Sequence, residues 1–380
     1  MKRFFSGAAV VSAASIFGLT YGLSAPLIAM NLADRGSSTV VIGANAAMHA
    51  VGVLAIAPLL PRLATKINAR WLMIGALALS AATLALFPVA PSVWLWFPLR
   101  LGLGVAAEIL FVLSETWTNE LVDDRVRGRT MAIYTASLSL GFAGGPAILS
   151  LVGSGSIAYL VGAAIAVSAI LPLASPWLVT PEKAHPARLD LRGYLSAAPV
   201  VVATSLLNAA VETAGLSFIA LYATGMGWSE KSSLRLVSTL MVGAIVLQLP
   251  IGWLSDRVSP RRLALALVAL STVGALAWPS MLSIPWLAFG AIFLWGGVFV
   301  GIYTVMLTVV GSRWKGADLV GIYAVMSLAW GGGALLGPSL AGAAMHLSAH
   351  YGLPYFVAAA CATFGVFMAA SRDPAKAEST

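Results

Sequence analysis

The stretch "PIGWLSDRVSPRR", Pro250–Arg262, places Asp256, Arg257, Arg261 and Arg262 between two long apolar segments. Such a concentration of charge is unusual here, because only 9% of the chain is charged while 59% is hydrophobic and the mean hydropathy is +0.92. A soluble globular protein has roughly a quarter charged residues. Helices that are apolar all round are typical of proteins surrounded by lipid. The charged stretch is therefore interpreted as a short loop between two membrane-spanning helices.

The apolar segments on either side of this loop recur along the whole chain. A spanning helix needs about 20 mainly apolar residues, and by this rule the 380 residues contain twelve such segments. The longest polar stretch, Thr180–Gly193, falls midway and contains two prolines, which oppose helix formation. We therefore predict an all-α membrane protein of two pseudo-symmetric six-helix halves. The halves are residues 1–179 and 194–380, and the linker is residues 180–193.

The distribution of lysine and arginine indicates the orientation. If the N-terminus is inside, 18 of the 22 basic residues fall on one side of the membrane, and Arg100 lies within a span. Because basic loops stay in the cytoplasm, we expect a multi-pass inner-membrane protein with both termini cytoplasmic. The net charge of +8 then follows from topology and does not indicate a nucleic-acid partner. The first apolar run exceeds the ~7–15 residues of a signal peptide's core and is interpreted as a retained helix.

Two motifs occur twice at nearly the same offset. "GFAGGPAIL" from Gly141 and "GALLGPSLAG" from Gly333 both read G-x-x-x-G-P and lie 192 residues apart. "PRLATKINAR" from Pro61 precedes "GWLSDRVSPR" from Gly252 by 191 residues. These offsets indicate an internal duplication. Many transporters are built from such repeats, with their binding sites at the interface between the repeats.

The repeated loop resembles a signature of the major facilitator superfamily of secondary transporters. That signature, G-x-x-x-D-R-x-G-R-R, matches Gly252, Asp256, Arg257 and Arg261, although a serine replaces the second glycine. In the first copy a threonine replaces the aspartate, and Lys66 retains positive charge. The resemblance implies a latch that holds the cytoplasmic side closed, resting mostly on the second copy. We expect Glu115 to pair with Lys66 or Arg129 at the same gate, with direct proton coupling as the alternative.

Two further motifs extend the resemblance over essentially the whole chain. The superfamily's R-x-x-x-G in its fourth helix matches Arg100 and Gly104. Its fifth-helix G-x-x-x-G-P, associated in the family with exporters, matches Gly141, Gly145 and Pro146. A lone G-x-x-x-G would carry little weight, since it also serves helix packing.

Three carboxylates lie inside apolar spans: Glu108, Glu115 and Glu212. An ionised carboxylate is costly in a membrane, so each is a functional candidate. A carboxyl group in an apolar environment can exchange a proton near neutral pH, which proton coupling requires. Arg100, two turns from Glu108, either tunes it for function or forms a structural pair with it. Two carboxylates favour a cationic or neutral solute over an anion, and Arg100 weakens that preference.

The resemblance places helices one, four, seven and ten around a central substrate path. The residues that it directs toward this path are Tyr21, Glu108, Asn208, Glu212, Trp295 and Tyr303. Trp295 could instead simply pack. Asn45 and His49 form a second polar pair one turn apart, for which bonding to a neighbouring helix is the simpler interpretation.

The sequence contains no nucleotide-binding or hydrolase motif, and its single cysteine, Cys361, excludes a disulfide framework or thiolate metal cluster. We therefore expect no enzyme activity, cofactor or metal. The prediction is a monomeric, proton-coupled secondary transporter that moves a small solute by alternating access, as an exporter or antiporter. The alternatives are an uptake symporter and a non-transporting membrane sensor or assembly protein.

Overall fold

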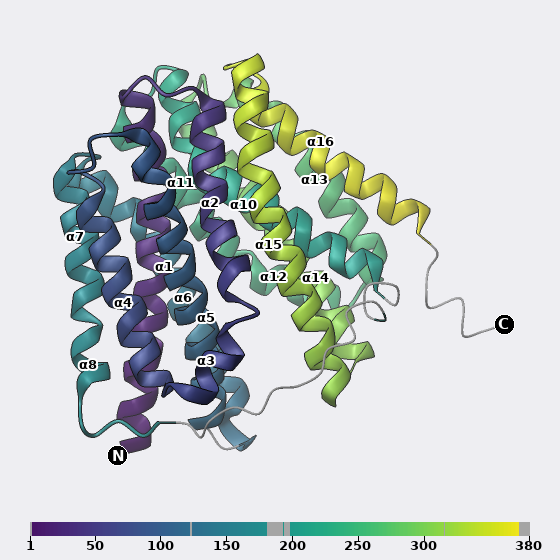
Figure 1. The fold of residues 1–380 in the computed structure, drawn as a ribbon. Helices are drawn as coiled ribbons and strands as arrows, with labels where there is room; N and C mark the ends of the chain where they lie inside the picture. The colour runs from purple at the N-terminus through teal and green to yellow at the C-terminus, as the bar shows by residue number, and fades with distance from the viewer. Residues whose placement is uncertain (1, 122–123, 181–192, 194–197, 315, 372–380) are drawn as a thin grey trace. The chain divides into compact units, whose positions relative to one another are not determined.

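The computed structural model describes residues 2–121, 124–180, 193, 198–314 and 316–371 (Figure 1). The described part of the chain is helical and contains no strand. Its elements are α1 (Lys2–Asp34), α2 (Thr39–Ile56), α3 (Leu60–Lys66), α4 (Ala69–Leu86), η1 (Val93–Leu95), α5 (Trp96–Leu121), α6 (Asp124–Val152), α7 (Ser156–Ser168), α8 (Ile170–Ala174), α10 (Pro199–Gly225), α11 (Glu230–Val246), α12 (Gln248–Ser255), α13 (Pro260–Met281), α14 (Pro285–Arg313), α15 (Gly316–Leu347) and α16 (Gly352–Ala370).

Twelve helical segments in the described residues are long and apolar enough to cross a membrane, which confirms the predicted number. Two of them are interrupted helices, α7 with α8 and α11 with α12. Pro172 and Pro250 each lie at the third position of the second helix in these pairs. Proline lacks the N–H that would continue the preceding helix, which accounts for breaks at these places.

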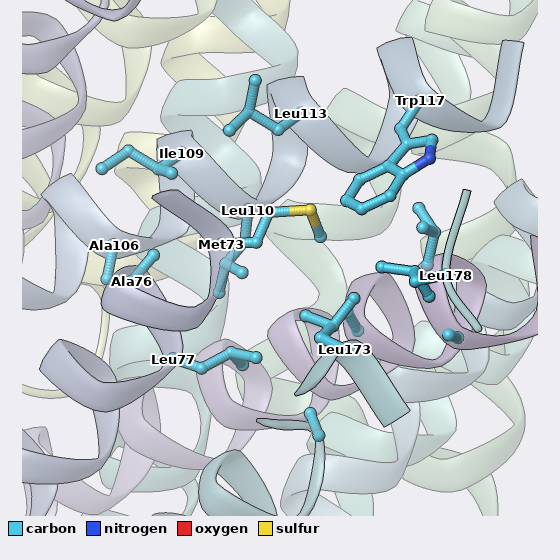
Figure 2. Close-up of a cluster of buried hydrophobic side chains, with 14 of the residues drawn as sticks. Met73, Ala76, Leu77, Ala106, Ile109, Leu110, Leu113, Trp117, Leu173 and Leu178 are labelled. Atoms are coloured by element: carbon cyan, nitrogen blue, oxygen red, sulfur yellow. The ribbon is translucent and has the colours of Figure 1, made fainter. Parts of the chain in front are cut away.

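An apolar cluster joins α1, α4, α5 and α8. Figure 2 shows its members as sticks, among them Met73 and Leu77 of α4 and Leu110 of α5. Trp117, near the end of α5, is fully buried in this cluster, and its indole N–H donates to the carbonyl oxygen of Val179 at 3.0 Å. This bond fixes the chain where it leaves the sixth span.

The chain forms two compact units, Met1–Ala187 with Gly215–Ser238, and Arg188–Ala214 with Thr239–Thr380. The predicted linker falls almost wholly on residues 181–192, which lie outside the described residues. The division into halves at residues 179 and 194 therefore stays a prediction.

Glycines set the closest helix contacts, and they do so at equivalent places in both repeats. In the first unit, Gly104 of α5 lies against the carbonyl oxygen of His49 of α2, so closely that a methyl group would overlap it. In the second unit, Gly296 of α14 lies in the same way against the carbonyl oxygen of Leu240 of α11. The sequence offsets are 192 residues for the glycines and 191 for their partners. The internal duplication thus reappears as one crossing geometry in each unit.

The G-x-x-x-G motifs make a second pair of equivalent contacts. Gly141 and Gly145 of α6 lie against the backbone of α1, which packs along α6 (Figure 1). Gly333 and Gly337 of α15 lie against the backbone of α10. Pro146 is buried within α6, directly after its motif. In this structure both motifs serve close helix packing, as small residues do in membranes.

Candidate functional site

A buried polar cluster surrounds Arg100 in the first unit. The side chain of Arg100, on α5, is only 2% exposed. Its Nη1 donates to Ser24 Oγ of α1 over 3.4 Å, and its guanidinium carbon lies 6.0 Å from the centre of the Tyr21 ring. Tyr21 is itself buried on α1. The positive charge is therefore held against a hydroxyl group and an aromatic ring, which are weak partners for a cation.

His49 of α2 joins this cluster, and a second buried polar residue of α2, Asn45, lies one turn away from it. The rings of His49 and Tyr21 lie with their centroids 4.5 Å apart. His49 Nδ1 is buried and has no hydrogen-bond partner. Asn45, one turn earlier on the same face, is completely buried, and neither its side-chain oxygen nor its nitrogen forms a hydrogen bond. A structural role for these two residues would require a hydrogen bond to a neighbouring helix. His49 Nδ1 and the Asn45 side-chain atoms form no such bond.

Glu108 lies apart from Arg100 on the same helix. Eight residues separate them, about 12 Å of helical rise, and no carboxylate in the described part of the chain forms an ion pair with Arg100. Glu108 is half-buried. The expectation that Arg100 tunes Glu108 therefore has no direct contact behind it and stays a prediction.

Glu115 lies two turns beyond Glu108 and is also half-buried. Its neighbour Ser114 shares a hydrogen bond of 3.0 Å with the hydroxyl of Tyr134 on α6. Lys66, expected at the same gate, is exposed at the end of α3.

The second unit contains a smaller polar pair on α10. Asn208 Nδ2 donates to Glu212 Oε2 over 3.1 Å, as their spacing of one helical turn allows. Asn208 is buried and its Oδ1 has no partner, while Glu212 is half-buried. Glu212 therefore has a neutral amide as its partner.

The aromatic candidates of α14 are held in packing contacts. The Trp295 indole N–H donates to the carbonyl oxygen of Ser271 on α13 at 2.9 Å, and its ring stacks on Phe299 at 5.1 Å. Trp278 of α13 meets the same ring edge-on. Tyr303 is half-buried and packs against an apolar cluster of the second unit. These contacts favour a packing role for Trp295 over a position on the substrate path.

The charged loop between α12 and α13 contains the residues of the expected cytoplasmic latch. Asp256 is exposed and, among the described residues, forms no ion pair. Gly252, a turn earlier in α12, has open space around it. The Arg257 guanidinium lies over the Trp253 ring, 3.7 Å from its centre. The latch that the resemblance implies stays a prediction.

The last arginine of each loop motif caps a helix. Arg261 Nη2 donates to the carbonyl oxygens of Met368, Ala369 and Ser371, at the end of α16. Arg70, 191 residues earlier in the sequence, donates to the carbonyl oxygen of Ala174 at the end of α8. A cation at a helix C-terminus is favoured by the helix dipole. The two copies of the loop thus share a structural role even though the first has lost its aspartate.

Two cluster members were missed by the sequence reasoning. Ser24 and Tyr159 carry no charge and stand in apolar runs, so nothing local distinguishes them. Tyr159, on α7, is 1% exposed with an unpartnered hydroxyl, and it lies within electrostatic reach of Arg100. No group of three or more histidine, cysteine, aspartate or glutamate residues suited to a metal ion occurs in the described ranges.

A family model described as Major Facilitator Superfamily matches residues 10–324 and 204–380. The chain belongs to this superfamily. Its similarity to a curated relative, the uncharacterized MFS-type transporter YfkF of Bacillus subtilis (strain 168), is 26% identity over 358 residues, 90% of this chain and 89% of the relative. It is an integral, multi-pass membrane protein of a transporter family.

Solved structures of superfamily transporters share its fold. A variant of the nucleoside transporter NupG has a TM-score of 0.80 at 14% identity, covering 96% of this chain and 99% of that one. A bacterial homolog of the human lysosomal transporter Spinster has a TM-score of 0.77 at 14% identity, covering 97% and 95%. A D-xylose-proton symporter has a TM-score of 0.76 at 14% identity, covering 97% of each chain. At this identity the likeness concerns the fold alone.

Proposed function

We propose that this superfamily member is a proton-coupled secondary transporter that moves a small solute across the inner membrane by alternating access. The observation that carries the proposal is the state of two carboxyl groups inside membrane spans. Glu108 and Glu212 are half-buried, and within the described residues neither forms an ion pair, while Glu212 accepts a hydrogen bond from the Asn208 amide. Without a cation nearby, an intramembrane carboxyl is stable in its neutral, protonated form and charged only when water reaches it.

This property links proton exchange to a conformational change. A carboxyl group exposed to water on one side releases its proton, and re-protonation is favoured before it is enclosed again. Solute binding that favours one of the two states shifts their populations, and this shift provides coupling. In the proposal, both termini lie in the cytoplasm, the protein acts as a monomer and no resident cofactor takes part.

Export by antiport is the proposed direction. Its support is the family association of the G-x-x-x-G-P at Gly141, Gly145 and Pro146, whose packing role in α6 is compatible with either direction. Uptake by symport is the alternative, and one observation favours it: a protein named as a D-xylose-proton symporter shares this fold.

The test is solute-dependent proton movement in liposomes that contain the purified protein and an internal pH-sensitive dye. Glu108→Gln and Glu212→Gln keep the shape of each side chain but cannot release a proton. We expect each to abolish solute-driven proton flux. Glu120→Gln, on the same α5 but exposed and beyond the span, is the matched control and should transport normally. Full proton flux in both span variants would contradict the assignment of these carboxyls.

A further inference from the structure

The charge of Arg100 is not balanced within the described part of the protein. A guanidinium stays protonated, and this one is buried inside the span Val93–Thr118. Its Nη1 has one long hydrogen bond to Ser24, and its Nε is buried without an acceptor. Buried charges in proteins are normally paired, because an unpaired charge in an apolar medium is strongly unfavourable. A group that brings the missing negative charge would remove this cost.

Unsatisfied polar atoms from two other helices accompany Arg100. His49 Nδ1, both polar atoms of the Asn45 side chain, and the Tyr159 hydroxyl are all buried without hydrogen bonds. His49 and Tyr159 lie within electrostatic reach of the guanidinium. Asn45 lies one turn before His49 on the same face of α2. Buried polar groups almost always have partners, so the unpartnered atoms of His49 and Tyr159 near this cation, with those of Asn45 beside His49, need a common explanation.

The internal repeat shows that the fold does not require these polar residues. By the offsets of 191 and 192 residues, Asn45, His49 and Arg100 correspond to Leu236, Leu240 and Ile292. Those three side chains are 1%, 6% and 2% exposed, as buried as their counterparts. The crossing is the same in both copies, since the carbonyl oxygens of His49 and Leu240 each lie against a glycine. The second repeat fills this helix crossing with apolar side chains. The first repeat has a cation there, with hydrogen-bond donors that have no acceptor.

We propose that Arg100, with Asn45, His49 and Tyr159, binds the carboxylate group of a small monoanionic solute. The inference rests on the proposed transport function and names the substrate class. Guanidinium and carboxylate are planar groups that match each other in two parallel hydrogen bonds. One arginine balances one negative charge, which favours a monocarboxylate over a phosphate dianion. Because Arg100 is only 2% exposed here, the site is closed in this conformation and opens during the transport cycle.

This assignment reverses the solute charge suggested by the sequence. That expectation came from counting Glu108 and Glu212 as negative charges. A carboxyl group that is protonated in the membrane carries no charge, whereas Arg100 always does. The permanent positive charge of Arg100 therefore determines which solute charge this site favours, and it repels a cationic solute.

The experiment measures the thermal unfolding midpoint of the purified full-length protein in detergent, with sodium acetate, lactate or benzoate at one fixed ionic strength. A ligand that binds the folded state raises this midpoint. We expect at least one of these monocarboxylates to raise it by about 2–4 °C at saturation. Sodium phosphate and sodium chloride are the competing anions, and tetramethylammonium chloride is the cation control.

Three variants locate the effect. Arg100→Met removes the charge at similar volume, while Asn45→Leu and His49→Leu install the residues of the other repeat. We expect the monocarboxylate shift to be lost in Arg100→Met and reduced in both leucine variants, which should fold at least as stably as the parent. Arg62→Met, at an exposed arginine of α3, is the matched control and should keep the full shift. If Arg100→Met does not fold, the two leucine variants still decide the question.

The outcomes separate this inference from the proposed function. No shift with any monocarboxylate, an equal shift with phosphate or chloride, or a shift that survives in Arg100→Met and both leucine variants would overturn the carboxylate site. Proton flux driven by a neutral or cationic solute would then leave the transport function standing. Conversely, an Arg100-dependent monocarboxylate shift without any solute-driven flux would support the site and contradict transport.

Discussion

At the residue scale, a buried polar atom whose hydrogen-bond partner is in place is explained by the structure, whereas one without a partner is a candidate for ligand binding. Trp295 is an example of the first kind, because its indole N–H is satisfied by the Ser271 carbonyl oxygen and its ring is enclosed by two aromatic neighbours. Arg100, His49 and Asn45 each have a buried side-chain atom without a hydrogen-bond partner, and their role in solute binding is the proposal made above. The presence or absence of a hydrogen-bond partner therefore separates side chains that the sequence alone presents equally as candidate site residues.

Trp295 provides a prediction at this scale. Trp295→Phe removes the 2.9 Å bond to Ser271 and should lower the free energy of unfolding by about 1 kcal/mol. Solute transport by the variant should keep its apparent KM, because the indole is a packing group. The measurements are the thermal midpoint and transport kinetics in liposomes. Trp286→Phe, at a 78% exposed position on α14, is the control for stability. A raised KM with an unchanged midpoint would show that Trp295 contacts the solute.

The sequence could predict which residues of the candidate site are unusual but not how they meet. Arg100, Glu108 and Glu212 were identifiable because a charge in an apolar span needs a reason. Ser24 could not be found, since its hydroxyl becomes relevant only when the fold brings α1 to Arg100, 76 positions away. The roles of Arg70 and Arg261 as caps were equally hidden, because each bonds carbonyl oxygens more than 100 positions along the chain.

At the element scale, small residues set how closely the spans approach. The sequence predicted the twelve spans from hydropathy, which depends only on local composition. It could not predict that Gly104 and Gly296 lie at equivalent crossings, because the two sequences around them share little besides the glycine. The crossing geometry emerges only when the backbones are in contact.

The glycine crossings give a prediction about stability. Gly104→Ala and Gly296→Ala each place a methyl group against a backbone carbonyl oxygen, and we expect a loss of about 1–3 kcal/mol for either, the usual cost of overpacking. Gly75→Ala is the matched control, because this glycine of α4 has open space around it. The control should be neutral or more stable by up to about 1 kcal/mol, since alanine favours helix. Thermal midpoints test all three, and equal behaviour would contradict the packing argument.

At the scale of the whole molecule, one contact within the first unit joins parts of the chain that the sequence assigns to different halves. Glu230, at the start of α11, accepts a hydrogen bond of 2.7 Å from the backbone N–H of Ser154, between α6 and α7. The Ser154 carbonyl oxygen in turn accepts from Asn31 Nδ2 at the end of α1, also at 2.7 Å. In the predicted topology all three residues lie at the outer side. In the proposed alternating-access mechanism the halves part at the outer side, and we therefore expect this contact to break once in each cycle.

Glu230→Ala should therefore shift the protein toward its outward-open state. Loss of a hydrogen bond to a charged group, about 1.5–3 kcal/mol, would raise the open-to-closed ratio by about tenfold or more, since 1.4 kcal/mol corresponds to a factor of ten.

The readout is maleimide labelling of a cysteine introduced by Ser233→Cys, at a position in α11 where the serine side chain is fully buried. The background is low because Cys361 is the sole cysteine and is buried. Asp34→Asn, at an exposed carboxylate ending α1, is the control and should leave the labelling rate unchanged. Equal labelling with and without Glu230→Ala would mean that this contact does not hold the outer side closed, and the closure would then have to come from apolar packing among the spans.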